Sequence, residues 1–120
     1  MKENEYIEQI SNLEYKKRAV TKQLAEIDDE IRAVRCKRAL FELVEGYKKR
    51  GETKESHVNI LPGHPVWCGI NHLFPELPYG EAVYLIVDGV KIKITQNTLD
   101  LYLGTEFEEE RITNLRKLEY

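Results

Sequence analysis

The strongest constraint on the fold is the absence of Gly and Pro from the first 45 residues, although the chain has seven Gly and four Pro. Apolar residues in this segment alternate at spacings of three and four, the heptad pattern of a coiled-coil helix. The series is Tyr6, Ile10, Leu13, Val20, Leu24, Ile27, Ile31, Val34 and Phe41. A helix over residues 3–45 would be about 60 Å long. Nothing in it permits a fold-back, so we expect residues 3–47 to pair with another copy of the chain.

Two cations interrupt this apolar series. We call the apolar series together with these two cations the seam. Lys17 and Arg38 stand where the pattern calls for an apolar residue, and a buried charge without a partner is strongly destabilising. One interpretation is that each side chain reaches solvent or pairs with an acid such as Glu14 or Glu42. The other is that both cations face an anion at the axis of an assembly. The second interpretation makes Lys17 and Arg38 candidate ligand-binding residues.

The chain divides into a rod, residues 1–50, and a folded module, residues 51–120. Gly46 and Gly51 are both suitable for ending the helix. Residues 1–50 carry 12 Lys/Arg against 10 Asp/Glu, whereas residues 51–120 carry 6 against 11. The net charge of -3 argues against a general nucleic-acid binder, which normally shows a basic excess.

Cysteine usage and hydropathy indicate the compartment. Cys36 and Cys68 form no CxxC pair, and two isolated thiols fit a reducing environment. The N-terminus is charged and lacks the apolar segment of a signal peptide. No apolar run approaches the roughly 18 residues that a membrane span needs. We therefore expect a soluble cytoplasmic protein with no membrane partner, located in the bacterial host if the chain is viral.

The module is predicted to contain an antiparallel β-meander. Ala82–Val87 and Val90–Thr95 are joined by Asp88-Gly89, a strong two-residue hairpin signal. Thr98–Leu103 follows after a second two-residue turn. One face of this meander is wholly apolar. The other is expected to carry one row of Tyr84, Lys93 and Asp100 and another of Ile86, Lys91 and Tyr102.

Shorter elements flank the meander. His57–Leu61 and Val66–Ile70 could each contribute a short strand. Thr105 to Glu108 reads as a capping box that opens a C-terminal helix to about Leu118. The expected fold class is α+β: a long N-terminal coiled-coil helix, then a small antiparallel β-meander module with a short C-terminal helix.

The polar face of the meander is the best candidate for a ligand site. Aromatic rings stack on nucleobases, while Lys and Arg neutralise phosphates. The candidate ligand-binding residues on and near this face are Tyr84, Lys91, Lys93, Asn97, Tyr102 and Arg111. The alternative is an ordinary solvated face on which Lys93 and Asp100 form a cross-strand ion pair.

Motifs for catalysis or metal binding are weak. The sequence has no glycine-rich phosphate loop, no GxSxG and no HExxH. His64, Cys68 and His72 are spaced four and four, but Pro65 argues against one helix that carries all three. Structural zinc sites also use shorter ligand spacings. We expect no enzymatic activity, no cofactor and no metal site.

The layout of a long N-terminal helix, a small antiparallel β module and a homo-oligomer resembles the phage anti-Thoeris signal-sponge proteins. The resemblance implies a non-enzymatic protein that sequesters a cyclic ADP-ribose-type or cyclic oligonucleotide immune signal. It also implies that an aromatic residue on the β module stacks on adenine, a role that Tyr84 in AVYLIV could fill. Arg111 in EEERITN would assist, and Lys17 and Arg38 of neighbouring copies would hold phosphates.

An alternative function follows from the acidic module and the seam. Such a chain could be a coiled-coil protein-binding inhibitor or adaptor whose acidic module mimics nucleic acid, as in some anti-CRISPR proteins.

Overall fold

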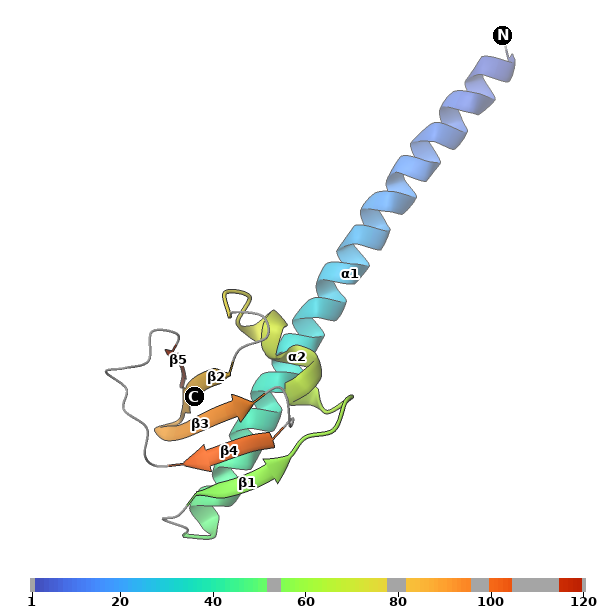
Figure 1. Ribbon diagram of the computed structural model, residues 1–120. Helices are drawn as coiled ribbons and strands as arrows, with labels where there is room; N and C mark the ends of the chain where they lie inside the picture. The colour runs from blue at the N-terminus through green and yellow to red at the C-terminus, as the bar shows by residue number, and fades with distance from the viewer. Residues whose placement is uncertain (1, 52–54, 78–81, 96–99, 105–114, 120) are drawn as a thin grey trace.

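The computed structural model describes residues 2–51, 55–77, 82–95, 100–104 and 115–119. It shows an α+β protein in which a long helix is followed by a five-stranded sheet and a short second helix (Figure 1). The elements are α1 (Lys2–Lys49), β1 (Ser56–Asn59), α2 (Pro65–Leu73), β2 (Val83–Val87), β3 (Val90–Thr95), β4 (Asp100–Gly104) and β5 (Leu115–Leu118). The predicted fold class is confirmed. The molecule measures 77 × 29 × 26 Å because much of α1 projects beyond the module.

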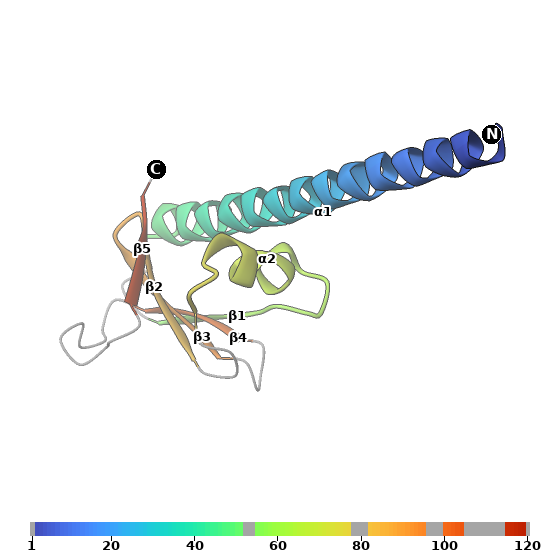
Figure 2. The same cartoon turned by 90° about the horizontal axis from the view of Figure 1, so that it is seen from above.

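α1 is the predicted rod, an unbroken helix of 48 residues. Acidic residues lie in its first turn and basic residues in its last, as the helix dipole favours. Gly46 does not end the helix. The chain turns at Gly51, whose φ of 64° is the left-handed conformation typical of the residue after a helix. The N-terminal part of α1 extends away from the rest of the protein (Figures 1 and 2).

The C-terminal turns of α1 pack on the module through a stripe of buried residues. The stripe consists of Cys36, Leu40, Val44 and Tyr47. At 3.6 residues per turn, this stripe lies on roughly the opposite side of the helix from the seam. The same turns of α1 therefore carry one apolar stripe against the module and a second one facing away from it.

The sheet has the strand order β1-β4-β3-β2-β5, with antiparallel pairs except between β2 and β5, which run parallel. The predicted Asp88-Gly89 hairpin is confirmed, and both residues have positive φ values, 47° and 80°. Lys48 of α1 binds this turn, because its Nζ lies 2.9 Å from Asp88 Oδ2 and 2.7 Å from the Asp88 carbonyl oxygen. The end of the rod is thereby attached to the hairpin.

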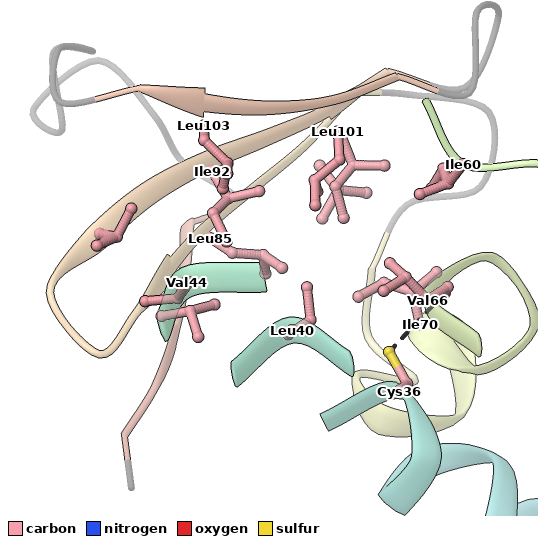
Figure 3. Close-up of a cluster of buried hydrophobic side chains, with 14 of the residues drawn as sticks. Cys36, Leu40, Val44, Ile60, Val66, Ile70, Leu85, Ile92, Leu101 and Leu103 are labelled. Carbon is pink, nitrogen blue, oxygen red and sulfur yellow. Dashed lines mark hydrogen bonds between the residues drawn. The ribbon is translucent and has the colours of Figure 1, made fainter. Parts of the chain in front are cut away.

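One hydrophobic core lies between the inner face of the sheet and the two helices (Figures 2 and 3). The largest fully buried side chains are Leu40, Ile60, Leu85, Ile92, Leu101 and Leu103, with Val44, Val66, Val87 and Cys36. Burial alternates strictly along β2 and β3, so every second side chain faces away from the helices. This opposite surface is called the outer face below.

The meander is predicted with the correct faces but with wrong partners for β4. The sequence aligns Lys93 with Asp100 across a two-residue turn, whereas the structure pairs Lys93 with Tyr102 and Thr95 with Asp100. The register differs by two residues because the four residues 96–99, which lie outside the described ranges, separate β3 from β4. A shift of two leaves each side chain on its predicted face.

Two other element predictions are wrong. Val66–Ile70, expected as a strand, belongs to α2, because Pro65 opens this helix where a missing N–H costs nothing and His64 caps it. Leu115–Leu118, expected to be helical, forms β5 on the free edge of β2. Periodicity over four residues does not distinguish these states. Residues 105–114, where that helix was expected to begin, lie outside the described residues.

The strand expected at His57–Leu61 is confirmed as β1, Ser56–Asn59.

Candidate functional site

The outer face carries one row of aromatic and cationic side chains that crosses four strands. Register places His57 of β1 opposite Tyr102 of β4, Tyr102 opposite Lys93 of β3, and Lys93 opposite Tyr84 of β2. We call these four residues the aromatic row. Directly opposed residues on neighbouring strands are close enough for their side chains to interact, so the row forms one continuous surface.

Contacts along the row fix the orientation of its rings. The rings of His57 and Tyr102 meet edge to face, with centroids 4.1 Å apart and an interplanar angle of 89°. Lys93 Nζ lies 5.7 Å from the centroid of the Tyr84 ring, within the range of a cation–π contact. The Tyr102 hydroxyl donates a hydrogen bond to the Glu55 carboxylate, and this bond, above all, raises the pKa of Tyr102. The hydrogen bond therefore moves the ionisation of Tyr102 to higher pH.

The charge around the row differs in sign from that of the module as a whole. Lys91 precedes Lys93 by two residues on β3, and the β2–β5 register places Lys117 beside Ile86. Asp100 is the acidic residue of the described strands that shares this face, where it lies opposite Thr95. The module is acidic by sequence, yet its sheet gathers lysines around two tyrosines.

The structure brings together half of the residues predicted for the site. Tyr84, Lys93 and Tyr102 are neighbours in one row, and Lys91 lies on the same face. The predicted Lys93–Asp100 pairing is wrong, as the register shows. Asn97 and Arg111 lie outside the described residues.

Lys17 and Arg38 do not join the outer face within one chain. Both lie on α1, which packs against the inner side of the sheet (Figure 2). Arg38 Nε forms an ion pair with Glu42 Oε1 at 3.0 Å on the helix surface, as the first interpretation of this residue predicts. Lys17 lies in the exposed N-terminal part, 19 residues before Cys36, which corresponds to roughly 28 Å along the axis.

His57 is a member of the row that the sequence prediction missed. It lies in a short strand whose alternation was visible in the sequence, but the strand's partner was not. β1 pairs with β4, more than 40 residues later in the chain, and this long-range pairing brings the imidazole beside Tyr102.

The spaced histidines His64 and His72 have structural roles. His64 Nδ1 accepts a hydrogen bond from the Val66 N–H at 3.1 Å and caps α2. His72 Nδ1 lies 3.6 Å from Asp29 Oδ1, between α2 and α1. Among the described residues, no three His, Cys, Asp or Glu side chains are grouped closely enough to hold a metal ion.

The seam is the second candidate functional surface. Its apolar members from Tyr6 to Val34 keep between 40% and 65% of their surface exposed. Soluble monomers rarely expose so long a row of apolar side chains, and such rows mark interaction sites. Beside its C-terminal end lies an open hollow of about 390 Å³, lined by Val34, Lys37, Arg38, Phe41, Glu42 and Glu45.

Comparisons with protein-family models, curated proteins and solved structures found no match. No helix in the described part of the chain is both long and apolar enough to cross a membrane.

Proposed function

We propose that this protein is a non-enzymatic, self-associating binding protein whose outer face holds an anionic aromatic ligand of the nucleotide class. The observation that carries the proposal is the aromatic row, in which Lys93 lies between Tyr84 and Tyr102. A tyrosine ring offers a stacking surface for a base, and base–aromatic stacking contributes about 1–3 kcal/mol per base. Lys91 and Lys93 supply charge for phosphate oxygens.

Self-association through the seam is part of this proposal. An exposed heptad stripe is stabilised when it packs against a second helix, and another copy of the chain always presents the matching stripe. A reducing cytoplasm is the proposed location, supported by two free cysteines, one of which is exposed.

The proposed site is narrower than the one predicted from the sequence. Lys17 and Arg38 are left out of the ligand site, because α1 lies behind the sheet relative to the outer face. Arg111 and Asn97 remain candidates by sequence alone. A cyclic nucleotide signal, such as a cyclic ADP-ribose isomer or a cyclic di- or trinucleotide, remains the proposed ligand.

The test is calorimetric titration of the whole chain with these nucleotides. We expect binding heat for at least one of them, at least a tenfold loss of affinity for Tyr84→Ala and Lys93→Ala, and no change for Lys22→Ala, which lies on α1 away from the seam. Absence of heat with every nucleotide would remove the proposal. Release of intact ligand after heat denaturation of the complex supports sequestration, whereas release of a cleaved product would show an enzyme.

A protein-binding inhibitor or adaptor is the second candidate. The observation in its favour is the same exposed seam, which would also accept an amphipathic helix of a different protein. Pull-down from a bacterial lysate with the Tyr84→Ala variant as bait distinguishes the two. A stoichiometric protein partner that survives this substitution, together with no nucleotide heat, favours the adaptor.

A further inference from the structure

We propose that α1 forms a two-stranded coiled coil in which two copies of the chain lie parallel and in register. This inference rests on the self-association proposed above and adds its direction, alignment and copy number. Four observations support it: the side of α1 that the module occupies, the spacing of the residues that line the hollow, the charges beside the seam, and the two cations within it.

The module leaves the seam exposed from Tyr6 to Arg38, and only Phe41 at its end is half-buried against the core. It covers α1 through Cys36, Leu40 and Val44, on roughly the opposite side of the helix from Val34 and Arg38. A second helix can therefore follow the seam past the point where the module begins. In a parallel arrangement the two modules would lie at the same end of the rod, each on its outer side.

The residues that line the hollow beside the seam have the spacing that a coiled coil uses. A side chain of one coiled-coil helix inserts between four residues of the other, at positions i, i+3, i+4 and i+7. The hollow consists of two such overlapping sets: Val34, Lys37, Arg38 and Phe41, then Arg38, Phe41, Glu42 and Glu45. These sets would receive two successive side chains of a second helix.

Charges that flank the seam favour the parallel alignment. In a parallel pair, the residue just before each core position of the set Ile10, Lys17, Leu24, Ile31 and Arg38 faces the residue five places later on the other helix. Glu30 then faces Arg35 of the second copy, and Lys37 faces its Glu42. No flanking pair of the whole seam joins like charges, because the other three pairs each include an uncharged residue.

Antiparallel alignments of comparable length are less favourable. Centred near residue 22, an antiparallel pair would place Glu14 against Asp28, although Lys16 would face Glu30. Centred about half a heptad later, it would place Lys16 against Lys37, although Glu14 would face Arg35. Each antiparallel alignment thus opposes one like pair for every opposite pair, whereas the parallel pair has two opposite flanking pairs and no like one, which is the better set of flanking contacts.

Lys17 and Arg38 favour two strands over three or four. In the parallel pair Lys17 faces Lys17 of the second copy and Arg38 faces its Arg38, but in a two-helix seam each long cationic side chain can extend past its neighbours to water and away from the other. A larger bundle would enclose it, and an enclosed cation without a partner is strongly destabilising. Polar residues at such core positions commonly specify register and oligomeric state.

Cysteine cross-linking tests the geometry. Each variant carries Cys68→Ser, so that the exposed native thiol does not react. In Leu13→Cys, the two new thiols face each other in a parallel pair, and mild oxidation should give a disulfide-linked dimer in nearly full yield. Val20→Cys should behave in the same way. The control Lys22→Cys, on the far side of the helix, should not cross-link.

Mixing Leu13→Cys with Ile31→Cys tests the antiparallel pair centred near residue 22, in which these two positions face each other. A 13–31 cross-link in place of the 13–13 cross-link would overturn the parallel alignment. A trimer or tetramer in sedimentation equilibrium of the unmodified chain would overturn the copy number. A monomer at every concentration would instead refute self-association itself, which separates the two failures.

Discussion

Gly69 of α2 lies so close to Arg32 of α1 that a Cβ atom on Gly69 would be 2.2 Å from the Arg32 carbonyl oxygen. The same Cβ would lie 2.6 Å from the Cys36 Cβ. Because Gly69 has no side chain, the backbones of the two helices come into direct contact, and this contact places α2 over one end of the core.

The first prediction concerns this contact. Gly69→Ala should destabilise the fold by about 1–3 kcal/mol, because either the helices separate or the backbone shifts. This loss outweighs the gain of up to about 1 kcal/mol that Ala gives over Gly within a helix. The measurement is urea unfolding followed by circular dichroism.

Gly46→Ala is the matched control, because its Cβ would meet only the end of the Arg50 side chain, at 3.7 Å. It should leave stability unchanged or raise it by up to about 1 kcal/mol. Equal effects of the two substitutions would contradict the close helix contact.

The second prediction concerns the two thiols. Cys36 is fully buried, with its Sγ 3.8 Å from the Val66 carbonyl oxygen (Figure 3), and Cys68 is exposed. A thiol-specific chromogenic reagent should modify one thiol per native chain and two per unfolded chain. Native Cys68→Ser should be unreactive. The matching control is native Cys36→Ala, in which only the exposed Cys68 thiol remains and should be modified rapidly.

The third prediction is a loss of stability at high pH. Burial raises the pKa of the Cys36 thiol from 9.0 to about 12. Between these values the folded chain holds a proton that the unfolded chain has released, so stability falls as pH rises through this window. The free energy of unfolding should fall by about 1.4 kcal/mol more in the wild type than in Cys36→Ala between about pH 8 and pH 10. An equal pH dependence of the free energy of unfolding in the two proteins would show that the Cys36 thiol is not buried.

The fourth prediction separates the seam from the core. Ile27→Lys should weaken self-association by at least about tenfold, because it places a charge in the middle of the proposed interface. Ile27 lies outside the buried core, so the urea midpoint of the module should not change. Sedimentation velocity gives the association constant. Ala25→Lys, which adds the same charge on the face of the helix away from the seam, should have little effect, and equal losses from both would contradict the interface.

The fifth prediction tests the geometry of the aromatic row. The pKa of Tyr102 is raised chiefly by the hydrogen bond to Glu55. Glu55→Gln should therefore shift the phenol titration toward its ordinary value, so that Tyr102 ionises at lower pH. Phenolate absorbance during alkaline titration measures this, and subtraction of the Tyr102→Phe titration isolates the signal. An unchanged curve would show that the hydrogen bond is absent in solution.

The parts of the fold that depend on local signals were predictable. The rod follows from a long Gly- and Pro-free heptad pattern, and the β2–β3 hairpin follows from Asp88-Gly89. The inner and outer faces follow from alternation alone. These signals lie within one element or one tight turn.

The parts that depend on long-range partners were not predictable. The register of β4 required the length of the connection after Thr95, and β5 required the free edge of β2. α2 was not predictable from periodicity, because Pro65 argues against a helix in the sequence although it opens this one. For the site, the sequence identified Tyr84, Lys93 and Tyr102, but not which of them are direct neighbours. His57 entered the row only through pairing of distant strands.

The buried stripe of α1 has one more consequence, because every segment that covers it comes later in the chain. On the ribosome, α1 emerges before these segments, with both apolar stripes open to solvent until the strands have been synthesised. Neighbouring ribosomes on one messenger would present nascent helices in the same direction. In the proposed two-chain assembly, pairing of the helices would then begin during translation, before either sheet exists.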